Sequence, residues 1–217
     1  MLSALLLAAA TGAAAAGLAG WARGGTDRPD SAWLRTPVVA ALGVGSGLLA
    51  GLRMESGAEA LAFLVVGLVF ALLFATDLAA QLIPHRVMWP GMLALLAGLT
   101  LAAAWEGSWR RLGGALLIGV VTMVCYFVIG WFGRGQFGLG DVSLSLFMGT
   151  FLGWLGVAHA LVGAVGAFLV YVPVALTMLA LRRAGRATEF AFGPCMIVAA
   201  WVAAFAGPAL LGAVLPG

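Results

Sequence analysis

Two aspartates, Asp77 and Asp141, are the residues of this sequence whose type and position best suit chemistry. Each stands at one end of a long apolar run, and Asp141 directly follows the glycine-rich stretch Gly133–Gly140. An ionisable side chain at membrane depth is costly to place there and usually serves a function. Two carboxylates brought together share one proton, because like charges about 3 Å apart cannot both ionise. Asp77 and Asp141 are therefore a candidate pair for acid–base chemistry.

Such a pair can hydrolyse a peptide bond. One carboxylate takes a proton from water while the other, protonated, polarises the peptide carbonyl. Asp141 is the better candidate for the base, because the N-terminal end of the helix that follows it favours a negative charge. Glycines without side chains would let an extended substrate lie close to the backbone. The candidate substrate-binding residues are Gly135, Gly138, Gly140 and Pro84.

We expect no metal and no other cofactor. His85 and His159 are expected near separate loops, without the three- or four-residue spacing of a ligand pair on a helix. Cys125 and Cys195 are far apart inside apolar runs, which is typical of buried small hydrophobic residues. The proposed hydrolysis by two carboxylates needs neither kind of ligand.

The composition is that of an integral membrane protein. Hydrophobic residues make up 64% of the chain and charged residues 9%, with a mean hydropathy of +1.12. Soluble domains have about 45–50% apolar and about 25% charged residues. Apolar runs repeat from end to end with no long polar segment between them, so we expect one membrane-embedded domain over residues 1–217. The basic residues are scattered among loops, which argues against a nucleic-acid-binding patch.

The apolar runs predict an all-α transmembrane bundle of about eight spans. They are expected over residues 2–20, 37–52, from 59 with Asp77 near the far end, 91–105, 113–132, 142–158, 159–181 and 195–214. Segment 81–90 contains two prolines and an interfacial tryptophan, so we expect a loop there. We expect a turn over 106–112. The sixth and seventh spans follow one another directly, which implies a tight hairpin.

The arginines predict the orientation of these spans, since an excess of basic residues marks cytoplasmic loops. The first, third, fifth and seventh loops hold eight arginines, whereas the second and fourth hold three. The odd-numbered loops are therefore expected in the cytoplasm and both chain ends outside. Asp77 and Asp141 are then both expected at cytoplasmic helix ends. The arginine count did not use the positions of the two aspartates, so this agreement is independent of it.

Three blocks of sequence resemble the prepilin peptidase family, a family of aspartic membrane proteases. Gly138-Leu139-Gly140-Asp141 is similar to its Gly-x-Gly-Asp signature, and Asp77 followed by Ile83-Pro84 and Pro90 is similar to its first-aspartate segment. Phe192-Gly193-Pro194 resembles its C-terminal block. Together the blocks span about residues 60 to 205. They place a family-like catalytic core over 59–214, behind N-terminal helices over 1–58.

The resemblance implies an endopeptidase that removes the short basic leader of type IV prepilin-like or pseudopilin proteins. It implies Asp77 and Asp141 as the catalytic pair, facing the cytoplasm from the cytoplasmic (inner) membrane of a bacterium or archaeon. The expected partners are a prepilin or pseudopilin substrate and the lipid bilayer, with no nucleic acid. The oligomeric state is left open.

Three features depart from the family pattern. The cytoplasmic domain with paired Cys-x-x-Cys motifs, present in many bifunctional members, has no counterpart in this sequence, so methylation of the new amino terminus is not implied. His85 stands where the family usually has Asn or Asp, and Ser143 where Lys is common.

Two alternatives stay open. Presenilin-type intramembrane proteases share Gly-Leu-Gly-Asp, and this chain also has Pro208-Ala209-Leu210, but Thr76 precedes Asp77 where those proteases have Tyr. The other alternative is a non-enzymatic transporter or assembly protein that uses the two aspartates as proton or cation sites.

Overall fold

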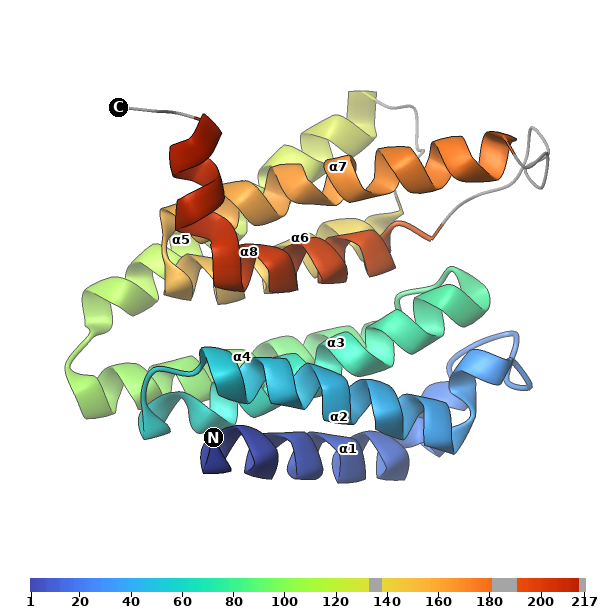
Figure 1. The fold of residues 1–217 in the computed structure, drawn as a ribbon, viewed down its shortest axis with the longest axis horizontal. Helices are drawn as coiled ribbons and strands as arrows, with labels where there is room; N and C mark the ends of the chain where they lie inside the picture. The colour runs from blue at the N-terminus through green and yellow to red at the C-terminus, as the bar shows by residue number, and fades with distance from the viewer. Residues whose placement is uncertain (133–137, 181–190, 215–217) are drawn as a thin grey trace. The chain divides into compact units, whose positions relative to one another are not determined.

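The computed structural model describes residues 1–132, 138–180 and 191–214, and within them the chain is helical with no strand (Figure 1). The long helices are α1 (Leu2–Arg23), α2 (Thr36–Arg53), α3 (Ala60–Ala80), α4 (His85–Glu106), α5 (Trp109–Phe132), α6 (Leu139–Leu155), α7 (Val157–Ala180) and α8 (Gly193–Val214). Two short 3₁₀ turns, η1 (Ala32–Leu34) and η2 (Gly57–Glu59), precede α2 and α3. Seven of these helices are long and apolar enough to cross a membrane, and α6 is shorter, with 17 residues. The all-α prediction is confirmed.

The chain divides into two compact units, and the division falls inside α5. The N-unit is Met1–Gly114 and the C-unit is Ala115–Gly217. In the N-unit α2 packs on α1 and on α3, and α3 packs on α4. In the C-unit α8 packs on α7, and α6 contacts both. That residues 1–217 form a single peptidase domain with a core over 59–214 stays a prediction.

Glycines let the helices of the N-unit approach one another closely. A Cβ on Gly47 in α2 would collide with the Thr11 hydroxyl and would lie 2.7 Å from the Leu7 carbonyl oxygen of α1. A Cβ on Gly98 in α4 would lie 2.7 Å from the Ala62 nitrogen of α3. The Thr11 hydroxyl lies 2.8 Å from the Gly43 carbonyl, a hydrogen bond between α1 and α2. Small residues and interhelical hydrogen bonds are the usual means of holding helices together where lipid removes the hydrophobic driving force.

A charged network closes one end of the N-unit. Glu59 is fully buried, and its carboxylate accepts hydrogen bonds from the backbone N–H groups of Glu55 and Ser56. Arg111, in the first turn of α5, pairs with Glu59 at 3.0 Å, with Glu55 at 3.6 Å and with Glu106 at 3.8 Å. The network therefore ties the start of α5 to η2, to the turn before it and to the end of α4.

The C-unit uses the same packing between α5 and α6. A Cβ on Gly149 would lie 2.8 Å from the Thr122 side chain, and one on Gly153 would lie 3.1 Å from the Ala115 Cα. Gly119 packs against Thr150 in the same way. The part of α5 that follows residue 114 is thus held directly against α6.

Two boundaries differ from the sequence prediction. Residues 85–90 were expected to be a loop, but they form the first turns of α4, with Pro90 inside the helix. Burial of Val87 and Met88 outweighs the cost of the one backbone hydrogen bond that Pro90 cannot donate. The turn expected over 106–112 is confined to Gly107 and Ser108, because Gly107 takes the left-handed conformation at φ 69° that ends α4 at once.

The hairpin between the sixth and seventh helices is as tight as predicted. Gly156 is the single residue between α6 and α7, and its φ of 131° is one that side-chain-bearing residues rarely adopt. Cys195 is buried as expected. The expectation was wrong for Cys125, which is exposed, because an apolar span in lipid does not reveal which of its faces is covered by protein.

Candidate active site

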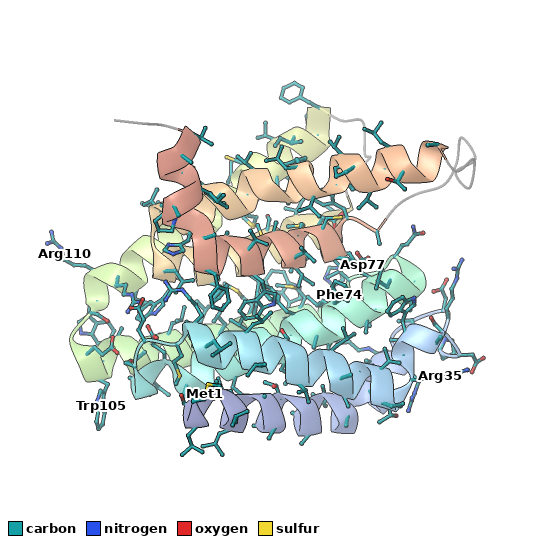
Figure 2. The ribbon with its side chains drawn as sticks, viewed as in Figure 1. Met1, Arg35, Phe74, Asp77, Trp105 and Arg110 are labelled. Carbon is teal, nitrogen blue, oxygen red and sulfur yellow. The ribbon has the colours of Figure 1, made fainter. Side chains whose placement is uncertain are left out.

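Asp77 lies in the last turn of α3 and is 4% exposed. Its carbonyl accepts a hydrogen bond from the Gln81 N–H at 2.8 Å, and Gln81 ends the helix in the left-handed conformation, at φ 53°. Only residues 81–84 separate α3 from α4, so the chain turns sharply directly after the aspartate. Figure 2 shows Asp77 toward the end of the N-unit that also carries Arg35, with Trp105 and Arg110 at the opposite end.

Pro84 is buried and occupies the N-cap position of α4, where its carbonyl accepts the N–H groups of Val87 and Met88. Arg86 follows in the first turn. Its guanidinium stacks 5.5 Å from the Trp21 ring of α1, and a Cβ on Gly25 would collide with it. The segment that follows Asp77 is therefore fixed to the C-terminal end of α1.

Asp141 lies in the first turn of α6, as the sequence predicts, and it is partly buried. Gly138 is the N-cap residue, and its N–H donates to the Asp141 Oδ2 at 3.3 Å. Asp141 lies outside the seven helices long enough to span the membrane. Burial raises the pKa of its carboxyl from 3.8 to about 6, and the hydrogen bond from Gly138 opposes this change. A carboxyl with this pKa exchanges its proton close to neutral pH, as a general base or acid requires.

The structure describes two of the candidate glycines before Asp141 but not the third. Gly135 lies outside the described residues, whereas Gly138 and Gly140 lie at the start of α6. Gly138 is exposed, has φ −69°, and a Cβ there would meet its nearest neighbour at an ordinary 3.6 Å. Neither backbone conformation nor internal packing explains the glycine at this position. Its role as a substrate-binding residue stays a prediction.

An aromatic cluster near Asp141 was missed from the sequence. Tyr126 of α5 is 2% exposed, its hydroxyl donates to the Ala164 carbonyl of α7 at 2.8 Å, and it lies within electrostatic reach of Asp141. Its ring contacts Phe168 and Phe192, with centroids 5.5 and 6.3 Å away, and Phe192 also meets Tyr171 at 5.3 Å. The cluster joins α5 and α7 to the residue that precedes α8. The sequence contains two tyrosines, Tyr126 and Tyr171, and both belong to this cluster. Their scarcity is the one feature of the sequence that could have indicated it.

Asp77 belongs to the N-unit and Asp141 to the C-unit, so their approach to one another stays a prediction. Within residues 1–132, 138–180 and 191–214, no group of three or more His, Cys, Asp or Glu side chains is arranged to hold a metal ion. The two candidate carboxylates lie at two separate helix ends, the last turn of α3 and the first turn of α6.

Comparison with known proteins points to one family. Residues 62–215 match the type IV leader peptidase family. The chain is 26% identical to a prepilin leader peptidase/N-methyltransferase of Aeromonas hydrophila over 204 residues, which cover 88% of this chain and 65% of that protein. It is 28% identical to the protein of the same name from Pseudomonas putida over 162 residues, which cover 71% of this chain and 53% of that protein. No solved structure gives a significant match.

The chain thus spans between about half and two thirds of the length of these two relatives. The family match covers most of the chain, from the start of α3 to the last helix, and includes both aspartates. Together with the seven apolar helices, it makes this a multi-pass membrane protein. The chain belongs to the type IV leader peptidase family.

Proposed function

We propose that this protein is an aspartic endopeptidase that removes the basic leader of type IV prepilin-like or pseudopilin substrates. The observation that carries the proposal is that both candidate carboxylates, Asp77 and Asp141, lie inside the region that matches a leader peptidase family. Cleavage takes place at the cytoplasmic face of the inner membrane of a bacterium or archaeon. The distribution of the arginines supports this orientation.

In the proposed mechanism Asp141 is the base. With a pKa of about 6 it is mostly ionised at neutral pH and still basic enough to take a proton from water. The mechanism assigns the protonated role to Asp77, which donates a hydrogen bond to the carbonyl oxygen of the scissile peptide. The water oxygen bonds to the carbonyl carbon while its proton passes to Asp141. The tetrahedral intermediate then collapses, the C–N bond breaks, and the leaving nitrogen takes from Asp141 the proton that this residue received from water, which leaves Asp141 ionised again.

The substrate backbone lies along the glycines ahead of α6. Gly138 supports this, since it is exposed and no contact within the described chain requires a glycine there. Gly135 and Gly140 serve the same purpose, and Pro84 fixes the start of α4 beside the Asp77 segment. An extended peptide is required, because a helical one has its carbonyls occupied by its own backbone hydrogen bonds.

Co-expression with a prepilin-like substrate tests this proposal. Asp77→Asn and Asp141→Asn are each expected to leave the leader uncut, whereas Asp27→Asn, in an exposed loop, is the matched control and cleaves normally. Immunoblotting of the substrate separates the precursor from the shorter product. Normal processing by either variant would rule out that aspartate as a catalytic residue. If wild type does not cleave but carries protons in liposomes, the transporter alternative is correct instead.

A further inference from the structure

The glycine pair Gly113-Gly114 lies inside α5, where the N-unit ends and the C-unit begins. Glycine weakens a helix interior, by about 1 kcal/mol relative to alanine, so a pair of them calls for a reason. At several other helical glycines, such as Gly98 and Gly149, the reason is close packing. At Gly113 and Gly114 a Cβ would meet nothing within 4 Å. Packing therefore does not account for this pair.

The chain is anchored on both sides of the pair. Two residues earlier, Arg111 is bound to Glu59, Glu55 and Glu106 of the N-unit. Directly afterwards, Ala115 lies against Gly153 of α6, and Gly119 lies against Thr150. The two glycines thus lie between these two sets of contacts, and a Cβ at either position would touch neither unit.

We propose that Gly113-Gly114 is a hinge in α5, about which the C-unit reorients relative to the N-unit. Without Cβ atoms these residues adopt a wider range of backbone angles than any others, and no neighbouring side chain resists the change. The hinge itself is inferred from the geometry alone, and only its role in catalysis rests on the proposed function. Since Asp77 and Asp141 lie in different units, bending at the hinge would control when the two carboxylates act together and when a substrate can enter.

Distances between spin labels test the hinge without reference to catalysis. Labels are attached at Leu93→Cys and Leu169→Cys, which are 67% and 69% exposed and belong to different units. Cys125 and Cys195 are first replaced by alanine. The full chain in lipid nanodiscs is then compared with the same chain carrying Gly113→Ala and Gly114→Ala.

Each alanine favours the straight helix up to about fivefold, so the pair favours it up to about 25-fold. Wild type is therefore expected to show a broad distance distribution that narrows in the double variant. Gly17→Ala with Gly45→Ala is the matched control, because these helical glycines also have nothing within 4 Å and both lie in the N-unit. Its distribution is expected to match wild type. Equal widths in wild type and hinge variant, or equal narrowing in the control, would overturn the proposal.

Leader cleavage gives a second readout. The hinge variant is expected to lower kcat more than it changes KM, because the substrate contacts remain while the active orientation forms less often. Failure of the Asp77→Asn and Asp141→Asn test would remove the peptidase assignment and leave the distance result intact. Conversely, if the protein cleaves the leader but the two alanines change neither the spin-label distances nor kcat, there is no hinge at this position.

Discussion

Neutralising Glu59 is expected to destabilise the N-unit far more than neutralising any exposed acid beside it. Glu59→Gln keeps the size of the side chain but replaces the oxygen facing Arg111 at 3.0 Å with an uncharged group. Removing one partner of a buried ion pair costs about 3–5 kcal/mol. Arg111 is 29% exposed and keeps Glu55 and Glu106, so we expect a loss of about 2–3 kcal/mol.

Glu55→Gln is the matched control. Its side chain is 57% exposed and pairs with Arg53 at 2.8 Å. An exposed ion pair contributes about 0.5 kcal/mol. For a chain of this size 1 kcal/mol lowers the unfolding temperature by about 2–4 °C. In detergent, the midpoint temperature of thermal unfolding should therefore fall by about 4–12 °C in Glu59→Gln and by about 1–2 °C in Glu55→Gln.

A double-mutant cycle with Arg111→Met isolates the pair. We expect a coupling free energy of about 2 kcal/mol between Glu59 and Arg111, since the two charges meet where Glu59 is fully buried. Equal losses in Glu59→Gln and Glu55→Gln, or a coupling indistinguishable from zero, would refute the reasoning that burial makes this pair strong.

Four further predictions concern the site and the packing. Cleavage should fall about tenfold between pH 7 and pH 5 in a leader-processing assay, because Asp141 with a pKa of about 6 changes from about 90% to about 10% ionised, whereas an aspartate at 3.8 would stay ionised. The same raised pKa means that this carboxyl favours the folded state below about pH 4 and loses that contribution as the pH rises to 6, which denaturant titrations would detect. Gly47→Val should cost several kcal/mol of stability, because its side chain would occupy the space of the Thr11 hydroxyl, whereas Gly45→Val, with open space around it, should change stability by less than about 1 kcal/mol. Tyr126→Phe should lower the unfolding free energy by about 1 kcal/mol, the value of its hydrogen bond to Ala164, while Tyr126→Ala should cost at least 3 kcal/mol in the same measurement.

The number and type of the helices could be predicted because each span needs a long apolar run, and the sequence separates these runs with arginines, glycines and prolines. The position of Asp141 in the first turn of a helix was predicted for the same reason, since the apolar run begins directly after it. The start of α4 could not be predicted. The prolines that indicate a loop at 84 and 90 are compatible with a helix start when neighbours such as Val87 are buried.

Which face of each helix is buried could not be predicted either. In water the buried face is apolar and the exposed face polar, but in lipid both are apolar. Tyr126 is 2% exposed while the adjacent Phe127 is 46% exposed, and nothing in the local sequence distinguishes them. The aromatic cluster beside Asp141 was missed for this reason. The ion pairs of Glu59 and Arg111, 52 positions apart, likewise depend on how α4 and α5 fold back on η2.

The one-residue connection at Gly156 decides where topology mapping with reporter fusions can succeed. A reporter inserted there would have to replace a φ of 131° that side-chain-bearing residues rarely adopt, and it would separate two helices that share a single linking residue. The exposed segment Asp27–Asp30, between α1 and α2, has room for an insertion without interrupting a helix. A fluorescent or phosphatase reporter placed there would report the membrane side of the first loop, and with it the side predicted for Asp77.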